Sequence, residues 1–559
     1  MTAIDDGATL EIPAEPALVA AVDDGPRREL QPVDAAPMAP ETRERRLDRT
    51  AALAVTLVLL GVYLVTMGGH TYSSDGETYL AGTRALVHHT TVMSPGTDMD
   101  AIVSLVQQKN GGYTTAAGVG TLLLFAPGYI AGKAVSLAFP VAAREEVLRL
   151  VYLSANSLFT ALTGGLLVLL CRALGARRRS AVLLALVFGL GTWAWPHSQT
   201  DFSEPGTMLM VTATMLASVH WWRSRSLRWP ALVGLLAGFT VLTRASTMVF
   251  LPALFFAGFI GAKRPRPEKV RQAVAFAAGG VIPGVLFAVN AWLRFGSPFD
   301  NGYPPMKYAT PVYEGMFGLI FSPGKGLLWY APVCIVVLFG LRQSMLAHRR
   351  YTLTILAIFV LHATVYARFE VWSGENAYGP RYLVPLLAVF VALLAPIIDS
   401  GSQWLRGVRL AGVVGFLIPG LLGATMYFNA VYSYSELHLM ADINVEATPT
   451  PTQQYLAWNF QPRSSPLILE LRAVPKLFEN SAARLRGEDG GITPMPVPYE
   501  ERIHWYARAI EPDFWWVWWS AKDLPAGAYL LGLVPLACLV GAAGLGRKLR
   551  RTTRLSESA

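Results

Sequence analysis

Two carboxylates, those of Asp75 and Glu77, follow the first long apolar stretch of the chain. A carboxylate just beyond a membrane-spanning helix can be ionised because water reaches it, while the helix fixes its depth relative to the lipid. Such a group can act as a general base on a lipid-borne substrate. The run Ser74-Asp75-Gly76-Glu77 also has the form of a helix capping box, in which Ser74 caps the helix and Glu77 reaches back to a free amide. The box accounts for Glu77 and leaves Asp75 as the first candidate for a base or a ligand.

A second acidic stretch, residues 197–205, joins two apolar spans and carries Asp201 and Glu204. Short loops from different parts of the chain can converge at one membrane face. Helix capping is the alternative explanation, with Ser203 or Asp201 as the cap and Glu204 favoured by the helix dipole. Capping does not require both carboxylates, so a functional role remains open for them.

Two basic residues lie where they could bind a phosphate. Arg244 separates two short apolar spans, where it can snorkel toward a lipid headgroup or hold a phosphate through two hydrogen bonds. Lys325 is flanked by Gly324 and Gly326 just before another span. Backbone amides and an ammonium group could therefore contact a phosphate together at Lys325.

A dense polar loop, residues 370–382, lies between two later spans. Exposure to water alone does not explain why so many charged, polar and aromatic residues gather in so short a loop. Carboxylates and amides hydrogen-bond sugar hydroxyls and flat aromatic rings stack on sugar faces, so the loop predicts a carbohydrate site. The candidate residues of this loop are Trp372, Glu375, Asn376, Tyr378 and Arg381.

The elements that position these residues are membrane helices. Of the 559 residues, 53% are hydrophobic and only 15% are charged, and the mean hydropathy is +0.38, which is typical of a polytopic membrane protein. The formal net charge of +9 comes from basic clusters between apolar spans, which orient such a protein in the membrane and do not indicate nucleic-acid binding. The three cysteines lie within or beside apolar spans, and zinc spacings, a P-loop and a dinucleotide fingerprint are missing from the sequence.

We expect an all-α protein with about twelve transmembrane helices, the first of them at Ala51 to Met67. Residues 1–50 form a disordered cytoplasmic tail in this prediction. If the arginine clusters all face the cytoplasm, both termini are cytoplasmic and Asp75 lies outside. The other predicted spans are residues 150–171, 181–197, 206–222, 230–244, 246–262, 271–293, 328–341, 352–368, 381–398, 409–430 and 527–545.

If one apolar stretch, Gly118 to Phe139, crossed the membrane, every later loop would lie on the opposite side of the membrane from the one predicted. The stretch contains Pro127 and Gly128, so we expect a broken, surface-lying or re-entrant pair of helices in the first outer loop. The transmembrane module then covers residues 51–430. Residues 431–526 form a small extracytoplasmic segment whose tryptophans suit an interface belt, and residues 527–559 hold the last helix and a basic cytoplasmic tail.

The order and common sidedness of these motifs resemble the GT-C superfamily of integral-membrane glycosyltransferases, which includes protein mannosyltransferases and aminoarabinose transferases. The resemblance covers about residues 51 to 398. It rests on the acidic motif Ser74-Asp75-Gly76-Glu77, the Asp201 and Glu204 loop, the turn Leu242-Thr243-Arg244, the stretch Ser322-Pro323-Gly324-Lys325-Gly326-Leu327 and the Trp372 to Arg381 loop.

The resemblance implies an inverting transfer of a sugar from a polyprenyl-phosphate carrier, with Asp75 as the base that deprotonates the acceptor hydroxyl. Asp201, Glu204 and Glu77 would orient the acceptor or hold a divalent cation, Mg²⁺ or Mn²⁺, as acidic loops do in some relatives. The donor phosphate would be bound by Arg244, Lys325 and Arg381. The sugar or acceptor would be bound by Trp372, Glu375, Asn376 and Tyr378.

The leading hypothesis from the sequence is thus a glycosyltransferase of the bacterial cytoplasmic (inner) membrane. It would act on the extracytoplasmic face, on a glycan, lipid or protein acceptor of the cell envelope. A polytopic transporter or lipid flippase of envelope precursors is the alternative, although transporters place functional charges near the bilayer midplane on broken helices. An inactive, scaffolding relative of the same fold is a third hypothesis.

Overall fold

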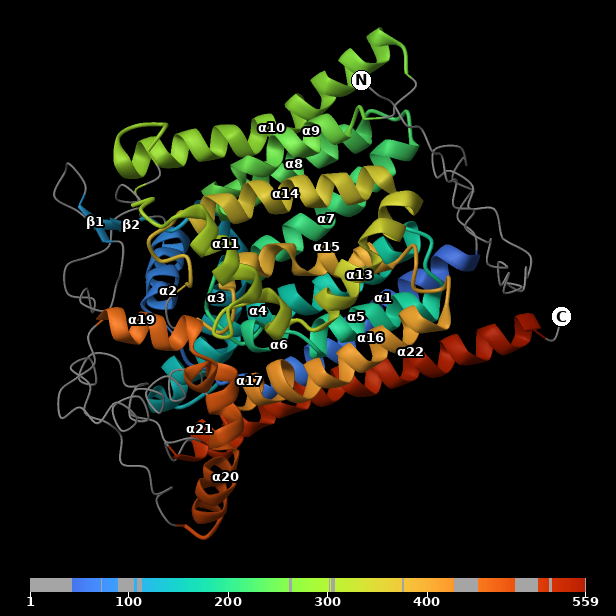
Figure 1. The fold of residues 1–559 in the computed structure, drawn as a ribbon. Helices are drawn as coiled ribbons and strands as arrows, with labels where there is room; N and C mark the ends of the chain where they lie inside the picture. Colours follow the sequence, from blue (N-terminus) through green and yellow to red (C-terminus); the bar gives the residue numbers. More distant parts are fainter. Residues whose placement is uncertain are drawn as a thin grey trace, which may run out of the picture.

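The computed structural model describes residues 43–71, 73–88, 105–107, 113–260, 264–300, 302, 307–374, 377–426, 451–487, 511–521 and 525–557. These residues form helices and one small antiparallel sheet (Figure 1), so the prediction of a helical membrane protein is confirmed. The first elements are α1 (Arg43–Thr66), α2 (Ser74–Val87), β1 (Leu105–Gln107), β2 (Tyr113–Thr115), α3 (Val119–Ser136), α4 (Val141–Ala173), α5 (Arg178–Leu190) and α6 (Ala194–His197).

The middle of the chain supplies most of the bundle. Its elements are α7 (Glu204–Arg223), α8 (Arg228–Thr243), the 3₁₀ helix η2 (Ala245–Val249), α9 (Phe250–Ala257), α10 (Arg266–Phe295), α11 (Val312–Phe321), α12 (Leu327–Tyr330), α13 (Val333–Ala347), α14 (Arg349–Ala367), η3 (Arg381–Leu386), α15 (Leu387–Val391) and η4 (Ala392–Leu394). The last elements are α16 (Ser402–Gly415), the π-helix η5 (Phe416–Leu422), α17 (Gly423–Thr425), α19 (Pro451–Phe460), η6 (Pro462–Ser464), α20 (Pro466–Leu485), α21 (Trp515–Ala521), η7 (Ala526–Gly532) and α22 (Leu533–Glu557).

Seven of the described helices are long and apolar enough to cross a membrane, by length and composition. Six of them coincide with predicted spans, namely α1, α4, α10, α14, α16 with its continuation to Thr425, and η7 with α22. The other six predicted spans fall on shorter helices or on α7, so the count of twelve stays a prediction.

The seventh candidate span, α3, corrects the prediction for Gly118 to Phe139. A broken, surface-lying or re-entrant pair of helices was expected there, but α3 is one continuous helix with Pro127 inside it. Its glycines serve packing: a Cβ on Gly132 would lie 2.8 Å from the Leu148 carbonyl oxygen of α4, and one on Gly128 would lie 3.2 Å from that of Tyr152. Helices approach closely where small residues meet, so the glycines seat α3 on α4. That α3 does not cross the membrane stays a prediction.

The basic end of α1 corrects the boundary of the N-terminal tail. The helix begins at Arg43 instead of Ala51, and residues 1–42 lie outside the described part of the chain. The first turns are held by ion pairs: Asp48 accepts from Arg172 at 2.9 Å and from Arg178 at 2.8 Å. Arg43 donates to the Thr552 carbonyl of α22. The start of α1 and the end of α22 therefore lie together.

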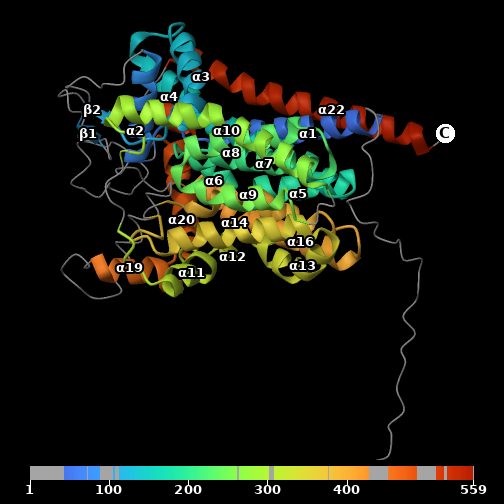
Figure 2. The same cartoon turned by 90° about the horizontal axis from the view of Figure 1, so that it is seen from above.

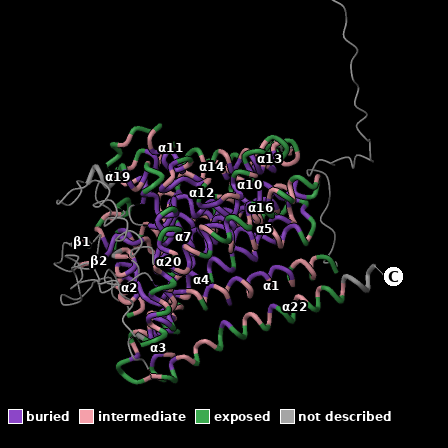
Figure 3. Tube along the Cα trace, turned by 60° about the horizontal axis from the view of Figure 1, so that its bottom comes forward, coloured by how far each residue is buried: buried purple, intermediate pink, exposed green. Residues whose placement is uncertain are grey.

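The opposite end of the bundle carries α2, the β1–β2 sheet and α19, away from the C-terminus (Figures 1 and 2). A helix of the length of α1 spans roughly 36 Å. This distance separates the basic ends of α1 and α22 from the candidate residues that follow α1. In Figure 3, α1 and α22 lie at the edge of the bundle and α22 is mostly exposed or intermediate, while α4 and α7 lie inside the bundle and are mostly buried.

The segment after residue 430 packs more tightly than the sequence suggested. Trp515 and Trp519 are 4% and 0% exposed and belong to a core cluster with residues of α3 and α4. The prediction that these two residues lie in an interface belt is therefore wrong. Trp516 is 40% exposed, as expected for a belt residue. Trp505 lies outside the described residues.

Candidate active site

The N-terminus of α2 places Asp75. The predicted capping box is off by one residue: Ser73 is the cap, and its hydroxyl accepts a hydrogen bond from the Gly76 amide at 3.1 Å. Glu77 does not reach back to the cap. Its carboxylate pairs with Arg149 of α4 at 2.6 Å and accepts from the Thr71 hydroxyl. Glu77 thus joins α2 to α4, and it is not among the residues lining the large cavity described below.

Asp201 completes this helix start from the second acidic loop. Its carboxylate accepts from the Ser73 amide at 3.1 Å and from the Ser73 hydroxyl at 3.0 Å, and the residue is 1% exposed. The loop is in turn anchored to α4, where Asn156 donates to the carbonyls of Thr200 and Phe202 at 2.7 and 2.8 Å. In this structure Asp201 therefore fixes α2 and its first-turn residue Asp75.

Glu204 starts α7 and lies between two guanidinium groups. Its side chain is fully buried, with Oε1 at 2.7 Å from Nη1 of Arg244 and 3.2 Å from Nε of Arg381. A buried carboxylate is stable as an ion only when positive groups and hydrogen bonds compensate its lost hydration. The two arginines supply that compensation, and Glu204 in turn holds them side by side.

Arg381 connects Glu204 to Asp75. Its Nη2 lies 2.8 Å from Oδ2 of Asp75, and its guanidinium lies 4.3 Å from the ring centre of Phe202. The Asp75 side chain is 32% exposed, whereas that of Glu204 is 0% exposed. Arg381 is thus fixed by a buried carboxylate on one side and meets a carboxylate in contact with open space on the other.

Arg244 is held by three groups that the sequence did not predict as its partners. Besides Glu204, it donates from Nε to the Tyr366 hydroxyl at 2.7 Å and from Nη1 to the Ser203 hydroxyl at 3.2 Å. Its guanidinium also lies 5.3 Å from the ring centre of Tyr382. Tyr382 could have been predicted from the sequence, because it directly follows Arg381 in the dense polar loop. Tyr366 closes an apolar span and carries no comparable signal.

A cavity of about 900 Å³ gathers these groups. Asp75, Arg244 and Arg381 line it, so residues of three separate sequence motifs meet at one cavity. Much of the rest of its wall is apolar and comes from α8, η2, α10 and α14. The apolar residues include Val241, Met248, Val249, Phe287, Phe295 and Val365.

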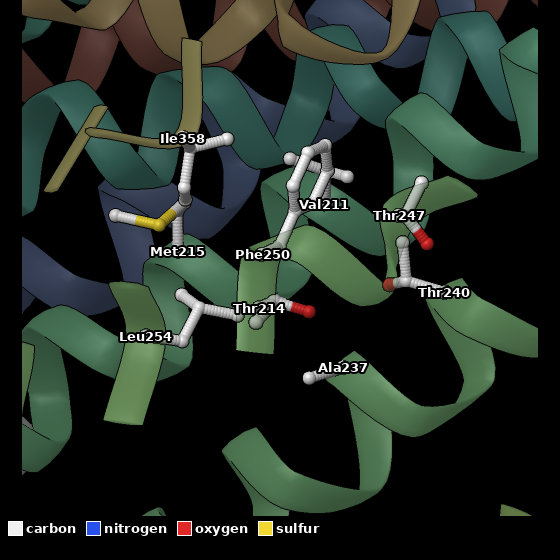
Figure 4. A pocket seen from close by; sticks show the side chains of 9 residues that line it. All are labelled: Val211, Thr214, Met215, Ala237, Thr240, Thr247, Phe250, Leu254 and Ile358. Atoms are coloured by element: carbon white, nitrogen blue, oxygen red, sulfur yellow. The ribbon is translucent and has the colours of Figure 1, made fainter. Parts of the chain in front are cut away.

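A second hollow lies deeper in the bundle, between α7, α8, η2, α9 and α14. Figure 4 shows its lining, which includes Val211, Met215, Phe250, Leu254 and Ile358. Its volume of about 10 Å³ is the space of a single water molecule. It therefore has no room for a substrate.

Three predicted binding residues are buried away from the cavity. Trp372 is 0% exposed and donates from its indole nitrogen to the Tyr455 hydroxyl at 2.6 Å, so it cannot stack on a sugar. Tyr378 is 1% exposed and lies in the core. Lys325 is 1% exposed and donates to the Ala377 carbonyl, so it holds the polar loop in place. Because these three side chains are buried in the protein and do not line the cavity, the prediction that they bind substrate is wrong. Glu375 and Asn376 lie outside the described residues.

Helix α20, in the segment after residue 430, supports the same polar loop. The Tyr378 hydroxyl donates to Glu470 at 3.0 Å, and Glu470 is 0% exposed. Burial raises the pKa of Glu470 to about 8. The carboxyl group is therefore mostly neutral at pH 7, and its hydrogen bond docks α20 on the loop that carries Arg381.

The acidic residues do not form a cation site. Among the described residues, no three His, Cys, Asp or Glu side chains gather so that they could hold a metal ion. Arg381 lies between Asp75 and Glu204, and Asp201 is bound to Ser73. A guanidinium between two carboxylates occupies the place that a divalent cation would take, so the residues present do not fit the predicted Mg²⁺ or Mn²⁺.

Comparison with known proteins gives structural likeness alone. The sequence matches no protein-family model and no curated protein. The apo oligosaccharyltransferase of Archaeoglobus fulgidus matches with a TM-score of 0.46 and 13% identity over 75% of this chain and 60% of that one. ArnT of Cupriavidus metallidurans, bound to undecaprenyl phosphate, matches with a TM-score of 0.44 and 13% identity over 89% of this chain and 76% of that one.

At 13% identity and with TM-scores below 0.5, neither match assigns this chain to a superfamily. This chain spans about three fifths of the length of the oligosaccharyltransferase. At such identity no residue role passes from one chain to another, so the site is interpreted from its own geometry.

Proposed function

We propose that this protein is a membrane glycosyltransferase that moves a sugar from a polyprenyl-phosphate carrier to an acceptor of the cell envelope. One observation carries the proposal: a carboxylate that could act as a base, Asp75, lines the same cavity as Arg244 and Arg381. Acid–base chemistry and neutralisation of a leaving phosphate are the two requirements of this reaction, and both kinds of group are present.

Asp75 is the base in this proposal. Its side chain reaches the cavity, whereas Glu204 is enclosed and Asp201 is bound to the start of α2. Asp75 takes the proton of the acceptor hydroxyl as the acceptor oxygen bonds to the sugar carbon C1. The bond from C1 to the carrier phosphate breaks on the opposite face, which inverts the configuration at C1. The electron pair leaves with the phosphate, and the proton ends on Asp75.

Arg244 and Arg381 stabilise the departing phosphate. Glu204 is paired with both guanidinium groups. The ring centre of Tyr382 lies 5.3 Å from the guanidinium carbon of each arginine. A planar guanidinium can bind two phosphate oxygens at once, and fixed donors need no reorganisation as charge develops. The apolar wall made by α8, η2, α10 and α14 suits the hydrocarbon chain of the carrier.

The site would face outward from the cytoplasmic membrane. Basic residues gather at the end where α1 starts and α22 finishes, and lysines and arginines are enriched on cytoplasmic sides. Both termini would then be cytoplasmic and Asp75 extracytoplasmic. The acceptor would be a glycan, a lipid or a protein of the envelope, and Glu375 and Asn376 stay proposed as contacts to it.

A transporter or flippase fits this geometry less well. The charged groups that line the cavity lie at the ends of helices and in loops: Asp75 is in the first turn of α2, Arg244 follows the end of α8 and Arg381 begins η3. Transporters place such groups near the bilayer midplane.

Asp75→Asn tests the proposal. The amide keeps the shape of the side chain but cannot accept a proton, so transfer should fall by at least about a hundredfold. The measurement is transfer of radiolabelled sugar from a polyprenyl-phosphate donor in membranes, with mass spectrometry of envelope glycans from cells that carry the variant. Unchanged thermal unfolding establishes that the variant is folded. Transfer at the wild-type rate would remove Asp75 as the base, and movement of intact lipid without transfer would favour the flippase.

A further inference from the structure

Arg381 binds two carboxylates that differ in their surroundings. Its Nε faces Glu204, whose side chain is fully buried, at 3.2 Å. Its Nη2 faces Asp75, whose side chain is 32% exposed and lines the cavity, at 2.8 Å. One side of the guanidinium is therefore fixed in the protein, and the other is directed toward the space where a substrate would lie.

The contact to Asp75 conflicts with the task proposed for Asp75. The guanidinium binds only Oδ2 of Asp75, but it compensates part of the negative charge that would attract the proton of an acceptor hydroxyl. Protonation of Asp75 would also end the ion pair, because a neutral carboxyl group no longer balances the guanidinium charge. Asp75 is therefore a stronger base when another anion takes its place on Arg381.

We propose that the donor phosphate is that anion: it displaces Asp75 from Arg381, so that binding of the lipid donor releases the catalytic base. This inference rests on the proposed function. The exchange is non-covalent and conserves charge, since one anion replaces another at Nη2 while Nε stays bound to Glu204. The released carboxylate then receives the proton of the acceptor hydroxyl when the bond from C1 to the phosphate breaks.

Burial decides which carboxylate gives way. Removing Glu204 from Arg244 and Arg381 would leave two guanidinium groups without their shared buried counter-charge, which is strongly unfavourable. Asp75 already contacts open space, so water can solvate it after release. The phosphate therefore exchanges with Asp75, and Glu204 holds Arg381 in place throughout.

The release mechanism predicts the order of events at the site. An acceptor that arrives first meets a base that is still bound to Arg381, and its hydroxyl is activated less. An acceptor that arrives after the donor meets a free carboxylate. The site therefore activates a hydroxyl best when a phosphate already occupies it.

Binding of farnesyl phosphate to the purified full-length protein in detergent tests this inference. In Asp75→Asn the phosphate no longer competes with a carboxylate for Arg381. The dissociation constant should fall about tenfold, which corresponds to about 1.4 kcal/mol. Asp75→Ala is a second variant that removes the same competitor. Binding of farnesol, which lacks the phosphate, should not change in either variant.

Glu370→Gln is the matched control for net charge. Glu370 lines the same cavity and is paired with exposed Lys307 at 3.7 Å, and no ion pair joins it to Arg381 among the described residues. Its neutralisation removes one negative charge from the wall and leaves the contact between Asp75 and Arg381 intact. We expect a change of less than about twofold, as for most exposed ion pairs.

The outcomes separate this inference from the proposed function. Equal tightening in Glu370→Gln and the Asp75 variants, or no tightening in the latter, would overturn the release mechanism while wild-type binding and transfer still support the glycosyltransferase. Failure of the wild type to bind farnesyl phosphate, together with absence of sugar transfer, would overturn the proposed function itself.

Discussion

Gly76 lies so close to Asp201 that a Cβ at position 76 would be 1.7 Å from the carboxylate oxygen Oδ2. The residue between the two acidic positions of the first motif is thus a glycine because the second acidic loop approaches there. The same approach allows Asp201 to bind Ser73 and fix the first turn of α2.

Replacing Gly76 with alanine should therefore reduce activity without touching a charged group. The added methyl group forces α2 and the Asp201 loop apart and moves Asp75 away from Arg381. A displacement of about 1 Å in a reacting group can cost on the order of a hundredfold in rate. Sugar transfer by Gly76→Ala is the measurement. Gly284→Ala in α10 is the control, because a Cβ there meets nothing within 4 Å. Wild-type transfer by Gly76→Ala would show that the position of Asp75 does not depend on this contact.

Replacing Glu204 with glutamine should affect both stability and activity. The amide leaves Arg244 and Arg381 without the carboxylate that lies between them, and loss of one partner of a buried ion pair typically costs about 3–5 kcal/mol. We expect a lower midpoint of thermal unfolding in detergent and a loss of transfer. Exposed Glu370→Gln should leave the midpoint nearly unchanged, since surface pairs contribute about 0–1 kcal/mol. A Glu204→Gln protein as stable as the wild type would contradict the role given to this carboxylate.

The docking of α20 should weaken as pH rises. Burial raises the pKa of Glu470 to about 8 in the folded protein, above the usual value of 4.5. The folded state therefore favours the protonated form, and this stabilisation is fully present below about pH 4.5 and is lost as pH rises through about 8. The difference in unfolding midpoint between the wild type and Glu470→Gln should change steadily over that range, to the disadvantage of the wild type at high pH. A difference independent of pH would mean that Glu470 does not titrate in this way.

Much of the architecture was accessible from the sequence because its cause is local. Apolar length and basic flanks locate the membrane helices, and six of the seven candidate spans coincide with predicted ones. The same topology places Asp75, Arg244 and Arg381 on one face, where the structure brings them to one cavity. Residue types and sidedness suffice for this step.

The contacts of the loops that carry the candidate residues depend on parts of the chain that are distant in sequence, so local patterns could not predict them. Trp372 and Tyr378 look like exposed sugar-binding residues until α19 and α20 cover them through Tyr455 and Glu470. Two adjacent serines allow either to cap α2, and it is Asp201 that selects Ser73. The glycines of α3 could signal a break or a close helix contact, and only the partner helix α4 decides between these.

The bonds from Asn156 to the carbonyls of Thr200 and Phe202 have a thermodynamic consequence for the site. Ordering a loop residue costs about 1–2 kcal/mol of backbone entropy. Because a membrane helix already fixes the loop that holds Asp201, this entropy is lost when the protein folds and not when a substrate arrives. The affinity for substrate then reflects its contacts with the cavity, undiminished by the ordering of this acidic loop.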